Sequence, residues 1–139
     1  MFEFLKKFFS SSPAINFQNI VAAKVLDIYK HPNADRLRLV KLDIGNQIID
    51  PVVCGAFNFE VGAVVALALP GAKIAQNIHD EKHLPFVLGK AKIRGVESQG
   101  MICASFELGL GHSFSEKPEI MILKNNIKPG SKFLPEMIK

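Results

Sequence analysis

Three cationic side chains alternate with apolar ones in Lys90-Ala91-Lys92-Ile93-Arg94, the segment with the clearest chemical pattern. Because side chains alternate across a strand, Lys90, Lys92 and Arg94 are predicted on one face, with Ala91 and Ile93 entering the core. At about 3.3 Å per residue, neighbouring charges would lie roughly 6–7 Å apart, close to the spacing of successive nucleic-acid phosphates. From charge alone, a phosphate-binding strand and a solvated face that resists edge pairing are equal alternatives.

A second basic group surrounds a turn-forming segment upstream. Four cations flank the turn at residues 31–35: Lys30, Arg36, Arg38 and Lys41. Asp35 and Asp43 dilute this group, and the whole chain carries a net charge of +4. This balance is mildly favourable to a polyanionic partner.

Aromatic content indicates how a nucleic acid would be recognised. Single-strand binders stack bases on exposed aromatic rings, but this chain has no Trp and one Tyr, and no aromatic residue interrupts the basic segment. We expect the phenylalanines to be core and loop anchors: Phe17, Phe57, Phe59, Phe86, Phe106, Phe114 and Phe133. Recognition by phosphate geometry and folded shape, as in structured RNA, is therefore favoured over base stacking.

Catalytic and metal-binding patterns are weak. The four histidines lack metal-ligand spacing: His31, His79, His83 and His112. Cys103 and His112 form a conceivable nucleophile and base, but a cysteine between Ile102 and Ala104 is usually a core residue. Cys54 and Cys103 are predicted to be buried, reduced thiols. We expect no cofactor, no metal and no catalytic residue.

The length and composition favour a single folded domain. The 139 residues are 48% hydrophobic and 22% charged, which excludes a disordered tail and a membrane bundle. No apolar run approaches the roughly 18 residues of a membrane span, and the start does not resemble a secretory signal. A cytoplasmic protein without membrane contact is expected.

The chain divides into a short start, 1–14, and a domain, 15–139. Residues 1–9 predict an amphipathic helix, which the segment Ser10-Ser11-Ser12-Pro13 ends. Thereafter we expect short strands and one helical turn, at 105–110. The alternation of apolar and polar residues changes phase within 37–44, which indicates a bulge in a strongly curled strand. Residues 63–69 are apolar on both faces, as in a central strand. The expected strands are 20–29, 37–44, 48–53, 63–69, 90–94, 100–104 and 120–123, followed by a tail that packs back on an all-β barrel or sandwich.

Four segments in order resemble the tRNA-binding OB-fold domain family: His31-Pro32-Asn33-Ala34-Asp35-Arg36-Leu37, Val53-Cys54-Gly55-Ala56-Phe57-Asn58, Ala68-Leu69-Pro70-Gly71-Ala72, and residues 92–103. The later segments Glu107-Leu108-Gly109-Leu110-Gly111 and Lys128-Pro129-Gly130-Ser131 are most similar to the N-terminal tRNA-binding domain of bacterial phenylalanyl-tRNA synthetase beta subunits. The resemblance implies a five-stranded OB-fold barrel with extra short strands and a C-terminal extension. It also implies that the turn at 31–35 shapes a neighbouring loop.

The function that this resemblance implies is tRNA binding without catalysis. The expected RNA-contacting residues are Arg36, Arg38, Lys90, Lys92, Arg94, Ser98, Met101 and Ser105. Synthetase subunits are possible partners, and the chain would be a free-standing relative or a shortened subunit. The alternative is a protein-interaction or dimerisation module of the same fold, with the 1–9 helix as its contact. The charged insertion at 77–84 exceeds what the resemblance to this family implies.

Overall fold

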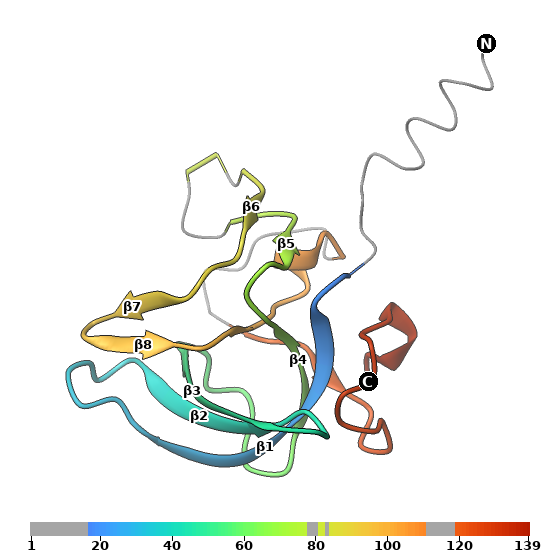
Figure 1. Ribbon diagram of the computed structural model, residues 1–139, viewed down its shortest axis with the longest axis horizontal. Coiled ribbons are helices and arrows are strands. Elements are labelled where there is room, and N and C mark those ends of the chain that lie inside the picture. The colour runs from blue at the N-terminus through green and yellow to red at the C-terminus, as the bar shows by residue number, and fades with distance from the viewer. Residues whose placement is uncertain (1–16, 78–80, 83, 111–118) are drawn as a thin grey trace.

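Short antiparallel strands supply nearly all of the regular structure. The computed structural model describes residues 17–77, 81–82, 84–110 and 119–139 (Figure 1). The predicted helix at 1–9 and its linker therefore lie outside the described residues. In this described part, no helix is long and apolar enough to cross a membrane. The elements are β1 (Ile20–Lys30), β2 (Arg38–Asp43), β3 (Ile48–Cys54), β4 (Val64–Ala68), β5 (Lys73–Ile74), β6 (Phe86–Val87), β7 (Ala91–Ile93), β8 (Val96–Ser98), β9 (Met101–Ile102), η1 (Phe106–Leu108), β10 (Ile122–Leu123) and η2 (Pro135–Met137).

The main sheet has the order β10-β4-β1-β2-β3, with β9 paired to β4. All its ladders are antiparallel, and the sheet curls into part of a barrel (Figure 1). Register irregularities explain the curl: Leu26 is an extra residue in β1, and β3 carries an extra residue opposite the step from Val40 to Leu42. The strong bend predicted near 37–44 is present, but the extra residues belong to the neighbouring strands and not to β2.

The segment from Ser98 to Ile102 joins the two edges of the curled sheet. On one side, Met101 and Ile102 pair with Ala68 and Leu67 of β4. On the other side, the Gln99 amide donates to the Pro51 carbonyl at 2.9 Å, and the Val53 amide donates to Ser98 Oγ at 2.9 Å. The segment from Ser98 to Ile102 therefore forms a seam between β4 and β3, which is consistent with the expected OB fold.

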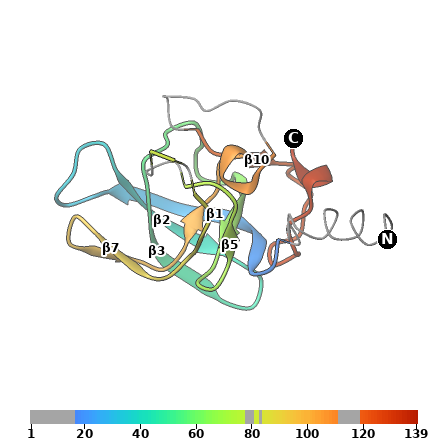
Figure 2. The same ribbon diagram turned by 90° about the horizontal axis from the view of Figure 1, so that it is seen from above.

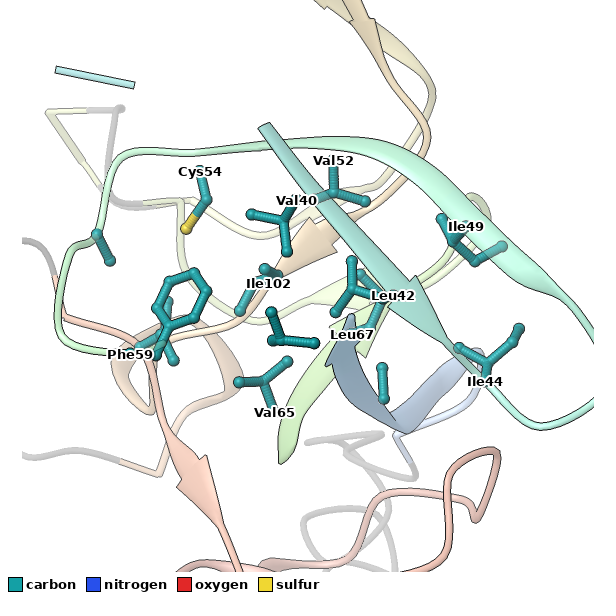
Figure 3. Close-up of a cluster of buried hydrophobic side chains, with 14 residues drawn as sticks. Val40, Leu42, Ile44, Ile49, Val52, Cys54, Phe59, Val65, Leu67 and Ile102 are labelled. Atoms are coloured by element: carbon teal, nitrogen blue, oxygen red, sulfur yellow. The ribbon is translucent and has the colours of Figure 1, made fainter. Parts of the chain in front are cut away.

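Two apolar clusters lie on either side of β4. All five residues of β4 are buried, which confirms the predicted central strand. The barrel interior is drawn in Figure 3, and its labelled members are Val40, Leu42, Ile44, Ile49, Val52, Cys54, Phe59, Val65, Leu67 and Ile102. The second cluster joins the barrel to the C-terminal extension through Phe133, Leu123, Leu108, Ile74 and Cys103.

The C-terminal extension packs back on β1, as predicted. The Ala22 amide donates to the Ser131 carbonyl at 2.8 Å, and the Gly130 amide donates to the Ala22 carbonyl at 2.7 Å. The Phe133 ring is fully buried and meets Phe17 edge to face, with ring centroids 5.1 Å apart. Gly130 has φ +95°, and a Cβ there would lie 2.4 Å from the Ile44 carbonyl oxygen.

We expect Gly130→Ala to lower the free energy of unfolding by about 3 kcal/mol, because a left-handed backbone and a backbone clash both oppose the new Cβ. Gly62→Ala is the matched control, since Gly62 has φ +98° but open space around a Cβ. It should cost only about 1–2 kcal/mol. Urea unfolding measures both, and equal losses would contradict the close approach of the extension to Ile44.

Candidate nucleic-acid interface

The basic segment 90–94 forms half of a hairpin and not a strand of the main sheet. β7 pairs with β8, and the two-residue turn between them holds Arg94 at φ +51° and Gly95 at φ +91°. Positive φ at both turn residues is the geometry that matches strand twist in tight hairpins. Ala91 is exposed and Ile93 only half-buried, so the prediction that both enter the core is wrong. The hairpin is a two-stranded sheet of its own, separate from the curled main sheet.

The cations of this segment therefore do not form one regular row. Lys90 precedes β7, Lys92 lies on it, and Arg94 lies in the turn. All three residues are exposed. Glu97 stands directly across the ladder from Lys92, so an acid from β8 shares this face.

The hairpin turn is fixed to the connection between β1 and β2. His31, 1% exposed, accepts a hydrogen bond at Nδ1 from the Asn33 amide (3.0 Å). This assignment leaves its Nε2 to donate to the Ile93 carbonyl at 3.0 Å. Both ring nitrogens are thus used to hold two loops together. The expectation that the 31–35 turn shapes a neighbouring loop is confirmed.

Asn33 makes the second contact between these loops. Its Nδ2 donates to the Arg94 carbonyl at 2.9 Å, and Arg94 Nη2 donates in return to the Asn33 carbonyl at 3.4 Å. Arg36 is exposed in the same connection, next to the docked turn. Figure 1 shows the connection between β1 and β2 beside the β7–β8 hairpin, and the hydrogen bonds of His31 and Asn33 join the two. The exposed cations of these two joined loops are Arg36, Lys90, Lys92 and Arg94, which we call the two-loop surface.

Lys30 and Asp35 border the two-loop surface without neutralising it firmly. Lys30 Nζ and Asp35 Oδ1 are 4.0 Å apart, and their side chains are 80% and 96% exposed. Solvent screens such a pair, which contributes little to stability.

Arg38 occupies a different position from the other predicted contacts. Its guanidinium carbon lies 4.5 Å from the Phe57 ring centroid and 4.7 Å from that of Phe59. Its Nη2 donates to the Ala56 and Phe59 carbonyls at 3.2 and 3.1 Å. The Arg38 side chain is therefore engaged in contacts within the protein. Phe57 is 52% exposed, so among the predicted core and loop anchors it is a loop residue and not a core residue.

Ser98, Met101 and Ser105 lie on the barrel seam and beyond it. Ser98 is buried, and its hydroxyl donates to the Gly100 carbonyl at 2.9 Å while accepting from Val53. This hydroxyl closes the barrel and does not face solvent. Met101 in β9 and Ser105 before η1 are half-buried.

The comparisons with known proteins agree with this architecture. The family model described as "Putative tRNA binding domain" matches residues 20–132. The chain belongs to this family.

Curated relatives in this family are much longer than the chain. A phenylalanine–tRNA ligase beta subunit of Chlamydia pneumoniae is 48% identical over 95 residues, which cover 68% of this chain and 11% of that subunit. The Wolinella succinogenes subunit is 46% identical over 109 residues, covering 78% of this chain and 12% of the subunit. The matched domain thus spans about a tenth of these relatives.

Solved structures support the fold alone. A MetRS related protein from Pyrococcus horikoshii matches with a TM-score of 0.58 and 18% identity, over 83% of this chain and 88% of that one. The C-terminal domain of Plasmodium vivax p43 matches with a TM-score of 0.51 and 23% identity, over 81% of this chain and 56% of that one.

Among the residues that the structure describes, three buried titratable groups have raised pKa values: Glu107, Cys54 and Cys103. Burial raises the pKa of Glu107 to about 7, opposed by a hydrogen bond that its Oε1 accepts from the Ala104 amide at 2.8 Å. Burial also raises the pKa of Cys54 to about 11 and that of Cys103 well above its usual value. Both thiols are free and protonated at neutral pH, which makes them poor nucleophiles. Across the described residues, no group of three or more His, Cys, Asp or Glu is placed to hold a metal ion.

We expect Asn33→Ala to loosen the hairpin without unfolding the barrel. Losing the bond to the Arg94 carbonyl should speed amide hydrogen exchange in β7 and β8 about fivefold, while β1 to β4 exchange as before. Asp35→Ala, a change in the same turn at an exposed ion pair, is the control and should leave exchange unaltered. Equal exchange in the two variants would show that Asn33 does not hold the hairpin.

Glu107→Gln should alter how stability depends on pH. The folded chain holds the Glu107 proton up to a pKa of about 7, against 4.5 for an ordinary carboxyl, so the free energy of unfolding falls as pH rises through this interval. The loss is at most about 3 kcal/mol. The glutamine variant should lack this fall and be more stable at pH 8. Urea unfolding from pH 4.5 to 8, with exposed Glu97→Gln as control, checks this, and parallel profiles would refute it.

Proposed function

We propose that this chain is a non-catalytic module that binds folded tRNA through the two-loop surface. The observation that carries the proposal is the fixed docking of the basic hairpin on the 31–37 connection, through His31 and Asn33. OB folds bind nucleic acids with their second and third strands and with loops of this kind. Membership of the tRNA-binding domain family supports the same conclusion.

Electrostatic attraction provides most of the proposed affinity. Arg36, Lys90, Lys92 and Arg94 are exposed, and each can displace a condensed counterion from a phosphate. Arg38 is not part of this contact, because its guanidinium is already held by aromatic rings and carbonyls. Ser98 is also omitted, since its hydroxyl is buried. Met101 and Ser105 are half-buried, and we propose that their exposed parts make secondary contacts with the RNA.

The proposed absence of catalysis is consistent with the groups described. Both cysteines are buried, and both nitrogens of His31 are used structurally. The phenylalanine–tRNA ligase subunits named above make a synthetase subunit a reasonable partner, in keeping with a cytoplasmic location. Dimerisation through residues 1–9 stays a prediction that falls outside the described part of the chain.

Removing the positive charges of the hairpin should weaken tRNA binding and make it depend less on salt concentration. Four phosphate contacts give a log–log slope of roughly −3 for affinity against salt concentration. The variant Lys90→Gln, Lys92→Gln, Arg94→Gln should reduce this slope by about two units. Fluorescence anisotropy with folded tRNA across a salt series measures it, and heat-unfolded tRNA and duplex DNA should bind more weakly.

A second triple variant controls for net charge. Lys124, Lys128 and Lys132 are exposed in the C-terminal extension, on the opposite side of the molecule from the β7–β8 hairpin (Figures 1 and 2). Changing these three residues to glutamine removes the same charge. The slope of log affinity against log salt concentration should nevertheless stay within about half a unit of the wild-type value. Equal flattening by both variants would mean that the two-loop surface is not the binding face.

A further inference from the structure

Phe57, Arg38 and Phe59 form a column from the barrel interior to the surface. Phe59 is 4% exposed and belongs to the barrel core, where Figure 3 shows it beside Cys54 and Ile102. Arg38 is half-buried and lies within 4.7 Å of both ring centroids. Phe57 is 52% exposed. This gradient of burial places the Phe57 ring at the outer end of a column anchored in the core.

The column holds the Phe57 ring in a defined position. Arg38 Nη2 is fixed by the carbonyls of Ala56 and Phe59, the residues that precede and follow the 57–58 step. Asn58 Nδ2 and Oδ1 bond the Ile120 carbonyl and amide, each at 3.0 Å, which fixes the next residue of the loop. Arg38 Nε is buried without an acceptor among the described residues, and the guanidinium carbon lies over both rings. An exposed ring on so constrained a loop is pre-organised for contact.

The loop that carries Phe57 lies next to the connection between β1 and β2. Arg38 pairs with Lys30 of β1 on one side and with Cys54 of β3 on the other, so the 55–57 loop leaves the barrel at the end where the 31–37 connection turns. A Cβ on Gly55 would lie 3.8 Å from the Arg36 carbonyl oxygen. A single exposed ring on a loop next to the connection that carries Arg36 suits a planar group joined to a phosphate better than it suits an apolar protein surface.

We propose that the open face of Phe57 stacks an unpaired base of the bound RNA. This inference rests on the proposed function and deepens it, because it adds one base contact to a surface otherwise built for phosphates. Stacking on an aromatic ring accepts any base, since every base has a π face. Phe57 therefore selects RNA in which a base is unpaired near the phosphates that Arg36 and the hairpin contact.

A tryptophan reporter tests the stack directly. The chain contains no tryptophan, so Phe57→Trp in the full chain introduces a single tryptophan. Folded tRNA should quench its emission by at least half at saturation, whereas blunt duplex RNA without unpaired bases should not. Ile48→Trp is the matched control: Ile48 is 48% exposed and lies at the other end of the β2–β3 ladder, opposite Asp43. Its emission should stay nearly constant.

Affinity measurements give an independent readout. Phe57→Leu keeps an apolar side chain beside Arg38 but removes the ring, and it should weaken tRNA binding about tenfold with an unchanged salt slope. If the wild-type chain binds tRNA while Phe57→Trp shows no quenching and Phe57→Leu binds normally, the stack is wrong and the proposed function stands. Equal quenching by blunt duplex also refutes an unpaired base. If the wild-type chain ignores tRNA at low salt, both proposals fail.

Discussion

The buried imidazole of His31 is the constraint on which the candidate surface depends. A two-residue hairpin turn and the connection between β1 and β2 are both short, polar and exposed, and neither has enough apolar area to pack on the other. His31 joins them because one ring nitrogen accepts from Asn33 and the other donates to Ile93. With the ring shielded from water, these bonds do not compete with solvent. The cations of two distant segments consequently keep a fixed arrangement.

The five cationic residues that looked equivalent in the sequence take two different roles. Arg36, Lys90, Lys92 and Arg94 stay in water, where a phosphate can reach them. Arg38 begins β2 at a place where the side chain points between Phe57 and Phe59, and desolvation of its charge is offset by two rings and two carbonyls. The same argument applies to Ser98, whose hydroxyl replaces a backbone partner for Val53 at the seam. Arg38 and Ser98 therefore stabilise the fold, while the cations of the neighbouring two-loop surface remain exposed to solvent.

Local patterns predicted the barrel well because its strands follow local rules. Runs rich in Val, Ile and Ala predict β1 to β4. The run that is apolar on both faces corresponds to β4, which is buried on both faces. The sequence pattern does not predict the hairpin, although Arg94-Gly95 is a turn signal, because charged and apolar residues alternate without interruption from Lys90 through Arg94. The short strands β5, β6 and β8 carry too little pattern to identify. The contacts of Arg38 with Phe57 and Phe59 and of His31 with Ile93 join residues 19 to 62 positions apart, which no local pattern encodes.

The hairpin geometry bears on the shape of nucleic acid that the surface suits. An extended strand offers phosphates in a regular series, which matches a row of cations along one β-strand. Here the turn removes Arg94 from such a row, Glu97 interrupts it at Lys92, and Arg36 enters from another loop. A partner that satisfies this arrangement must bring together phosphates that are not successive, as tertiary folding of RNA does. Under the proposed function, this arrangement would suit a folded RNA better than an extended strand, for a reason different from the one that the aromatic composition suggested.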